Sequence, residues 1–201
     1  MTQPDAKRAL RTQLFDARRT LPSDERNIAN MAIQQELLTF LQVHGATSVA
    51  AYMPTPSEPG GTDLVPVLRK AGLEVLIPIS GKDSTLSWVR VDDDTEFVSG
   101  AFGISEPTGP ALQGQPLADV DVIIVPALAA NFSGYRLGKG GGYYDRALSE
   151  LSQPATVSIL FDHEVLDVIP LEEHDARTAA IITPTQILRI MEPFGPDDPS
   201  K

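Results

Sequence analysis

Short apolar runs of strand length recur along this chain, and helical segments separate several of them. Five runs read as buried strands, namely residues 49–53, 73–79, 121–125, 156–161 and 179–183. A sixth run, residues 86–91, alternates like a half-buried strand. Near-continuous apolar strands are typical of parallel sheets whose two faces are covered by helices. The pattern therefore predicts an α/β fold with a mainly parallel sheet flanked by helices.

Helical patterns precede and interrupt these strands. Apolar residues at helical spacing predict an N-terminal pair of helices, divided near Pro22 and ended by Gly45. Thr62 and Asp63 are expected to cap another helix, which ends near Gly72.

The rest of the chain reads as loop, two further helices and a tail. Residues 92–118 are polar and rich in Gly and Pro, which predicts a loop with little regular structure. Helices are expected over residues 143–151 and 185–191. We expect residues 1–192 to form a single α/β domain and residues 193–201 to be a disordered tail.

Composition excludes several classes of protein. The 201 residues include 16 Lys and Arg against 27 Asp and Glu, so the formal net charge is −11 at pH 7. This balance argues against broad contact with the phosphates of DNA or RNA, although a local pocket can still attract a small anion. Because the chain has no cysteine, disulfide scaffolds, thiolate zinc sites and cysteine nucleophiles are excluded.

Apolar patterning bears on where the protein works. Residues 1–13 have no apolar core of the kind that a signal peptide needs. Residues 122–130 are among the longest apolar stretches and are far shorter than a membrane span. We therefore expect a soluble cytoplasmic protein that contacts neither membrane nor nucleic acid, and we expect it to be a monomer.

One segment between a predicted buried strand and a predicted helix is unusually rich in glycine. Residues 131–142 hold five of the fifteen glycines, together with Arg136 and Lys139. Glycine lets the backbone approach a ligand, and successive amide N–H groups and helix N-termini bind anions. In open α/β sheets, ligands bind outside the carboxyl ends of the strands. The position favours a nucleotide-phosphate site over a flexible surface loop with two solvated cations.

Two common phosphate-binding templates do not match this segment. Gly140 stands where a P-loop needs Ser or Thr after Lys139, and Tyr143 stands where the dinucleotide motif has its last glycine. Asp145 falls in the first turn of the next helix, where an acidic residue offsets the helix dipole or, beside phosphates, holds Mg²⁺. Tyr143 and Tyr144 are either core anchors or stacking partners of a planar ligand.

One run of ten residues resembles the signature of the 5-formyltetrahydrofolate cyclo-ligases, also called methenyltetrahydrofolate synthetases: RLGKGGGYYD at 136–145. Four more segments resemble family segments in the same order, namely KRALR at 7–11, the strand and Glu-containing loop at 52–62, GISEP at 103–107 and the strand at 121–127. Two features depart from the family pattern. Asn131 replaces a frequent Asp, and the spacing from Glu58 to Thr62 is one residue longer than usual.

The resemblance implies a role for individual residues. The implied ATP contacts are Lys7, Arg11, Arg136, Leu137, Gly138, Lys139, Gly140, Gly141, Gly142, Tyr143 and Tyr144. The implied folate contacts are Met53, Glu58, Lys139, Gly140, Gly141, Gly142 and Tyr143. The implied catalytic residues are Lys139, Arg136 and Tyr143, and the implied Mg²⁺ ligands are Asp145 and Asp175. Without the resemblance, Lys7 and Arg11 would be an ordinary basic helix face, and Asp175 one surface acid among several.

The implied reaction converts 5-formyltetrahydrofolate to 5,10-methenyltetrahydrofolate with release of ADP and phosphate. The γ-phosphoryl group of ATP activates the formyl oxygen, and the neighbouring folate nitrogen then attacks the activated carbon and closes the ring. Such a transfer needs positioning and charge neutralisation more than a covalent protein group. The implied fold is similar to that of sugar-phosphate isomerases and CoA-transferases.

Two alternatives use the same parts. A phosphosugar isomerase would use the glycine segment for one phosphate and would need a general base but no ATP. A non-catalytic nucleotide or folate sensor would keep the glycine segment and Glu58 without a working magnesium pair. The presence of both Asp145 and Asp175 counts against the sensor.

Overall fold

A seven-stranded sheet forms the centre of the computed structural model, which describes residues 3–100, 103–149, 151, 155–172 and 175–190. Its strands are β1 (Ser48–Ala50), β2 (Glu74–Ser80), β3 (Leu86–Val91), β6 (Val122–Ile124), β9 (Thr156–Ile159), β11 (Ala180–Ile182) and β12 (Ile187–Arg189). They lie in the order β12-β11-β9-β6-β1-β2-β3. The five inner strands are parallel, and only the two edge strands β3 and β12 run antiparallel to their neighbours. The predicted mainly parallel sheet is confirmed.

The strand order is doubly wound. From β1 the chain moves to β2 on one side, and it later returns to β6 on the other side of β1. The connection after β1 leads to β2 on one side, and the connection after β6 leads toward β9 on the other side. The two connections therefore run in opposite directions, which opens a crevice beyond the carboxyl ends of β1 and β6. Ala50 and Ile124 are the last residues of these two strands, so the crevice begins just after them.

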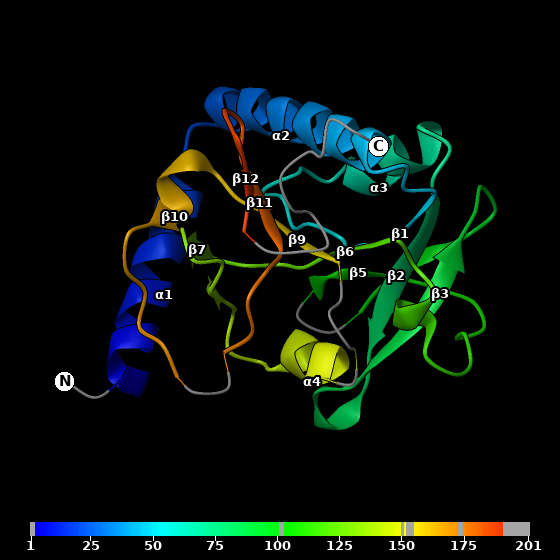
Figure 1. Cartoon of the computed structure of the whole chain (residues 1–201). Coiled ribbons are helices and arrows are strands. Elements are labelled where there is room, and N and C mark those ends of the chain that lie inside the picture. Colours follow the sequence, from blue (N-terminus) through cyan, green and yellow to red (C-terminus); the bar gives the residue numbers. More distant parts are fainter. Residues whose placement is uncertain (1–2, 101–102, 150, 152–154, 173–174, 191–201) are drawn as a thin grey trace, which may run out of the picture.

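Three of the four α-helices in the described part of the chain cover the two faces of the large sheet. The helices are α1 (Gln3–Thr20), α2 (Ser23–Val43), α3 (Leu64–Lys70) and α4 (Tyr143–Ser149). Helices α2 and α3 lie on one side and α4 on the other (Figure 1). Side chains alternate between the faces along each strand. Val49 packs in the cluster beneath α2 and α3, whereas Ala50 packs with Leu148 of α4.

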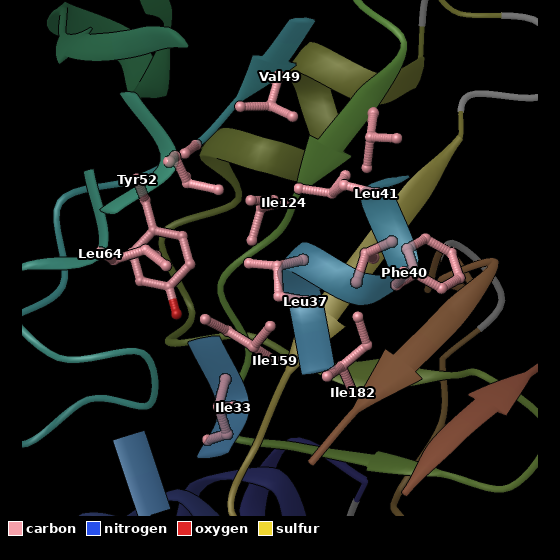
Figure 2. Close-up of a cluster of buried hydrophobic side chains, with 14 of the residues drawn as sticks. Ile33, Leu37, Phe40, Leu41, Val49, Tyr52, Leu64, Ile124, Ile159 and Ile182 are labelled. Carbon is pink, nitrogen blue, oxygen red and sulfur yellow. The ribbon is translucent and has the colours of Figure 1, made fainter. Parts of the chain in front are cut away.

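The larger core lies between α2 and the sheet. Ile33, Leu37 and Leu41 recur along one face of α2, as helical periodicity requires, and they are fully buried. Figure 2 shows these side chains interleaved with strand residues such as Ile124 and Ile159. This packing anchors the strands whose carboxyl ends form the crevice.

Helix α1 packs elsewhere, against a small second sheet. That sheet contains β7 (Ala129–Asn131), β8 (Arg136–Leu137) and β10 (Val165–Leu166), in the order β10-β7-β8. Leu14 of α1 packs against Leu128 and Leu137, and Figure 1 shows α1 beside β7 and β10. The glycine-rich segment is therefore no simple loop: its first part is a β7–β8 hairpin whose turn is closed by the Asn131 side chain, which accepts hydrogen bonds from the N–H groups of Ser133 and Tyr135.

Two sequence-based predictions of local structure are wrong. Residues 92–118 contain an antiparallel ribbon of β4 (Phe97–Ser99) and β5 (Ser105–Pro107). The segment predicted as a closing helix contains β12 instead, because Thr183 N–H donates to Gln186 O and turns the chain back beside β11. Periodicity cannot separate helix from strand in so short an apolar run.

Three short 3₁₀ turns complete the described structure: Lys82–Ser84, Pro116–Ala118 and Asp162–Glu164. Asp63 does precede α3, but its carboxylate makes no capping bond and instead accepts a hydrogen bond from Gln34 Nε2. Among the described residues, no helix is long and apolar enough to cross a membrane. The predicted tail, residues 193–201, lies outside the described residues.

Candidate active site

A cavity of about 410 Å³ opens at the crevice of the large sheet. Tyr52 and Met53 follow β1, Ser80 ends β2, and Pro126 follows β6. The other walls come from the β5 ribbon and from the segment that leads into α4. The lining residues are Tyr52, Met53, Thr55, Glu58, Pro78, Ser80, Leu86, Ile104, Ser105, Glu106, Pro126, Arg136, Gly138, Lys139, Gly140, Gly141, Gly142, Tyr143, Tyr144 and Asp145.

The glycine segment forms one wall of this cavity. Gly140 and Gly142 adopt φ values of +100° and +69°, a region that favours glycine. Arg11 of α1 supports the segment from behind, because its Nε donates to Gly138 O at 2.9 Å. A Cβ atom on Gly140 would lie 3.4 Å from Arg11 Cζ, so the guanidinium packs closely against the turn. Helix α1 thus sets the position of the segment.

Lys139 extends from this segment to a buried carboxylate on the opposite wall. Its Nζ lies 2.7 Å from Glu58 Oε1. Glu58 is 3% exposed, and its Oε2 accepts hydrogen bonds from both the N–H and the hydroxyl of Thr55. Arg18 Nη1 lies 3.9 Å from Glu58 Oε1 and adds a second positive charge. The Glu58 carboxylate is thus fully surrounded by donors and cations, as burial of a charge requires.

Arg136 and Asp145 form a second ion pair at the cavity wall. The other guanidinium nitrogen, Nη1, donates to Ala176 O at 3.0 Å. Burial lowers the pKa of Arg136, and the charge of Asp145 opposes that shift. Arginine stays protonated in proteins, so Arg136 presents a fixed positive charge beneath the glycine segment.

A third group of charges lies behind Arg136. Lys7 Nζ lies 2.7 Å from Asp175 Oδ2 and 2.5 Å from Glu172 Oε2. Burial acts to lower the pKa of Lys7, but hydrogen bonds to Asp175 and Glu172 outweigh it, so the pKa is raised. Lys7 therefore stays charged across the neutral range.

The two tyrosines of the segment occupy different environments. Tyr144 packs edge-on against Trp88 with ring centroids 6.1 Å apart, and burial raises its pKa well above the ordinary value. Within the described part of the chain, its buried hydroxyl has no hydrogen-bond partner. Tyr143 lies against the glycine segment, since a Cβ on Gly141 would fall 2.9 Å from Tyr143 Cδ2. Tyr144 is thus a core anchor on one side and a cavity wall on the other.

This geometry joins a glycine-rich turn, cations and a partly apolar cavity at a sheet switch point. A family model described as the 5-formyltetrahydrofolate cyclo-ligase family matches residues 3–184. The chain belongs to this family. The match spans α1, the cavity walls and every strand of the large sheet except β12.

Relatives agree with the family match along nearly their whole length. A 5-formyltetrahydrofolate cyclo-ligase of Mycolicibacterium smegmatis is 38% identical over 187 residues, which cover 90% of this chain and 95% of the relative. The enzyme of the same name from Escherichia coli is 28% identical, over 85% of this chain and 96% of the relative. The structure of 5,10-methenyltetrahydrofolate synthetase from Aquifex aeolicus superposes with a TM-score of 0.80 at 28% identity and covers 96% of this chain and 97% of its own.

Most of the residues implied by the resemblance to cyclo-ligases do lie together. Those on the cavity wall are Met53, Glu58, Arg136, Gly138, Lys139, Gly140, Gly141, Gly142, Tyr143, Tyr144 and Asp145. Lys7, Arg11 and Asp175 do not line the cavity but adjoin its glycine wall or its ion pairs. The Leu137 side chain packs in the core with Leu14, so only its backbone is available for the ATP contact that the resemblance implies.

Sequence reasoning missed two charged side chains that the structure places at the site. Arg18 lies on the same α1 face as Lys7, Arg11 and Leu14, at the spacing i, i+4, i+7 and i+11. This spacing was the sequence signal that could have placed Arg18 at the site. In the structure Arg18 is 1% exposed, and its Nε lies 2.6 Å from Glu164 Oε1. Glu106 also lines the cavity, and its signal was its place within the GISEP segment.

Proposed function

We propose that this chain catalyses the ATP- and Mg²⁺-dependent conversion of 5-formyltetrahydrofolate to 5,10-methenyltetrahydrofolate. One observation supports the proposal above the rest: in a member of the cyclo-ligase family, Lys139 of the glycine wall and Glu58 of the facing wall meet across one cavity. The cavity size suits a compact bicyclic ring with a phosphate beside it.

The glycine wall is the proposed ATP site. Gly138 to Gly142 offer backbone N–H groups, while Arg136 and Lys139 supply full charges. Lys7 and Arg11 reinforce the wall from α1 and complete the proposed ATP contacts. When ATP binds, its phosphates would replace Glu58 as the ion-pair partner of Lys139 and Asp145 as the ion-pair partner of Arg136.

Asp145 and Asp175 are the proposed Mg²⁺ ligands, and their chemistry fits. Both present carboxylate oxygens, and each is paired with a cation that the phosphates would engage. Among the described residues no cluster of three or more His, Cys, Asp or Glu side chains is present. Mg²⁺ is typically held by one or two carboxylates together with phosphate oxygens, so two carboxylates beside a phosphate would suffice. Bound there, the ion would neutralise phosphate charge.

The folate is proposed to lie between Met53 and the glycine wall, with its formyl oxygen directed at the γ-phosphate. Lys139 then stands next to both the phosphoryl group and the acceptor oxygen, where it offsets the negative charge of transfer. Tyr143 closes the wall over the reacting groups and helps to exclude water. Phosphate leaves as the neighbouring folate nitrogen attacks the activated carbon.

Product absorbance in the near ultraviolet tests this function. Purified protein is mixed with 5-formyltetrahydrofolate, with ATP and Mg²⁺ supplied together, singly or not at all. We expect absorbance of the methenyl product only when both are present. Product formed without ATP would contradict the mechanism. If no product forms but the protein still binds ATP, the substrate is another compound. If the protein neither forms product nor binds ATP, the proposed ATP site is wrong.

A further inference from the structure

Glu106 is a second buried carboxylate in the cavity, on a wall remote in sequence from Glu58. It lies at the centre of β5 and is 8% exposed. Its Oε1 accepts a hydrogen bond from the backbone N–H of Ser80, the last residue of β2, at 3.0 Å. The carboxylate is therefore tied to the carboxyl end of the inner strand β2.

The surrounding backbone holds this side chain in place. Glu106 pairs with Val98 across the β4–β5 ribbon. Gly100, just beyond β4, packs directly on the carboxyl group, because a Cβ at that position would lie 2.2 Å from Glu106 Cδ. The backbone N–H of Gly100 donates to Ile104 O and closes the ribbon around the side chain. This geometry leaves Glu106 little freedom to turn out into solvent.

The two cavity carboxylates differ in their partners. Glu58 is bonded by Thr55 and Lys139 and faces Arg18, so its lone pairs are in use. Glu106, in contrast, has no ion-pair partner within the described residues, and the Ser80 N–H is its one donor there. A buried carboxylate keeps a large unfilled demand for hydrogen bonds, and such groups cluster at ligand sites.

We propose that Glu106 recognises the donor edge of the pterin ring, an inference that rests on the proposed function. The pterin carries a 2-amino group beside a ring N3–H, and these two parallel N–H donors match the two oxygens of a carboxylate. Pro78, Leu86 and Ile104 line the cavity and offer apolar contact to the flat ring. Glu106 is thus a specificity-determining residue that selects a 2-amino-4-oxo ring over rings without that edge.

The first test is the variant Glu106→Gln, which keeps the shape of the side chain and the acceptor for Ser80 N–H. It sets an N–H donor against the pterin donors, so we expect the KM for 5-formyltetrahydrofolate to rise about tenfold or more. The KM for ATP should stay unchanged. Glu96→Gln is the matched control, since Glu96 is an exposed residue next to the same ribbon. Equal folate KM values in all three proteins would overturn the assignment.

The second test changes the ligand. We would measure the binding of 5-formyltetrahydrofolate and of its analogue with methyl in place of the 2-amino group, by calorimetry without ATP. The wild type should prefer the parent folate by about tenfold or more, and Glu106→Gln should lose most of that preference. An undiminished preference in Glu106→Gln would show that another group contacts the donor edge.

Turnover of the wild type distinguishes failure of this inference from failure of the proposed function. Normal turnover together with an undiminished preference overturns only the role of Glu106. Absent turnover overturns the cyclo-ligase function and this inference with it.

Discussion

At the scale of single residues, three cations of the site are already paired with carboxylates. Lys7 is bonded to Asp175, Arg136 to Asp145 and Lys139 to Glu58. Each pair joins a proposed ATP contact to a proposed ligand of metal or folate. Binding of the nucleotide with its cation would therefore exchange ion-pair partners rather than expose unpaired charges, which avoids a large desolvation cost.

Replacing Lys139 with alanine tests the cation that bridges the two walls. We expect Lys139→Ala to reduce kcat/KM for ATP about 100-fold or more, because a charge directed at the transferred group is lost. The melting temperature should change little, because Lys139 is partly exposed and Thr55 and Arg18 still compensate the Glu58 carboxylate. Lys82→Ala, in an exposed turn, serves as the control. Wild-type ATP kinetics in a folded Lys139→Ala protein would remove Lys139 from the site.

Asp145 lends itself to a magnesium titration. If it is a metal ligand, Asp145→Ala should need about tenfold or more Mg²⁺ for half-maximal activity, because ligand loss weakens metal affinity. An acid that only offsets the helix dipole would leave the titration unchanged. Steady-state rates across a Mg²⁺ series at saturating folate distinguish the two cases.

At the scale of elements, one exposed aspartate joins the starts of two central strands. Asp121 lies just before β6, whereas Thr47 precedes β1 and Ser48 begins it. Asp121 Oδ2 accepts hydrogen bonds from the N–H and hydroxyl groups of both Thr47 and Ser48. These bonds, first that from the Thr47 backbone, hold the pKa of Asp121 below its usual value of 3.8. The bonds fix the strand pair whose other ends form the cavity.

We expect Asp121→Ala to lower the free energy of unfolding by about 1 kcal/mol at pH 7, a value reduced by solvent screening. Because the pKa is lowered on folding, the stabilisation is complete above pH 3.8 and is lost as the pH falls through the folded-state pKa. Urea unfolding of the wild type and the variant should give a smaller difference in the free energy of unfolding near pH 3 than at pH 7. Asp119→Ala is the control. A difference between wild type and Asp121→Ala that does not depend on pH would contradict the role of the charge.

Elements were predictable where local pattern and tertiary packing agree. The two N-terminal helices, the five parallel strands and α4 follow from periodicity, although β1 and β6 are shorter than their apolar runs. The β4–β5 ribbon and β12 were not predictable, because their partners are set by pairing across the structure rather than by local preference. Glu106 lies on that ribbon, which explains why its place in the cavity escaped sequence reasoning.

At the scale of the whole molecule, the sheet order explains why distant motifs form one site. Segments near residues 53, 80, 106 and 139 reach one cavity only because β1, β2 and β6 end together. The sequence alone indicated the glycine segment and, through the family resemblance, most of its partners. It could not reveal that these groups already pair with one another, since pairing depends on distances in the folded chain.

Residues 193–201 offer a test at this scale. The last described strand, β12, ends at Arg189, and residues 193–201 (PFGPDDPSK) contain Phe194 as their one large apolar side chain, which is too little apolar surface for a core. We predict that deleting residues 193–201 leaves the melting temperature, the turnover and a monomeric mass in light scattering unchanged. A lower melting temperature or a loss of turnover would place the tail within the working domain.

The contact between Lys7 and Asp175 joins residues 168 positions apart in the chain. During synthesis, the N-terminal helix emerges first. Lys7 can contact Asp175 only after almost the entire polypeptide has been made. Contacts of such separation form late in folding. The proposed ATP site is therefore completed only when the chain is nearly finished, so truncated products would lack it. ATP bound at that site would then selectively stabilise full-length molecules.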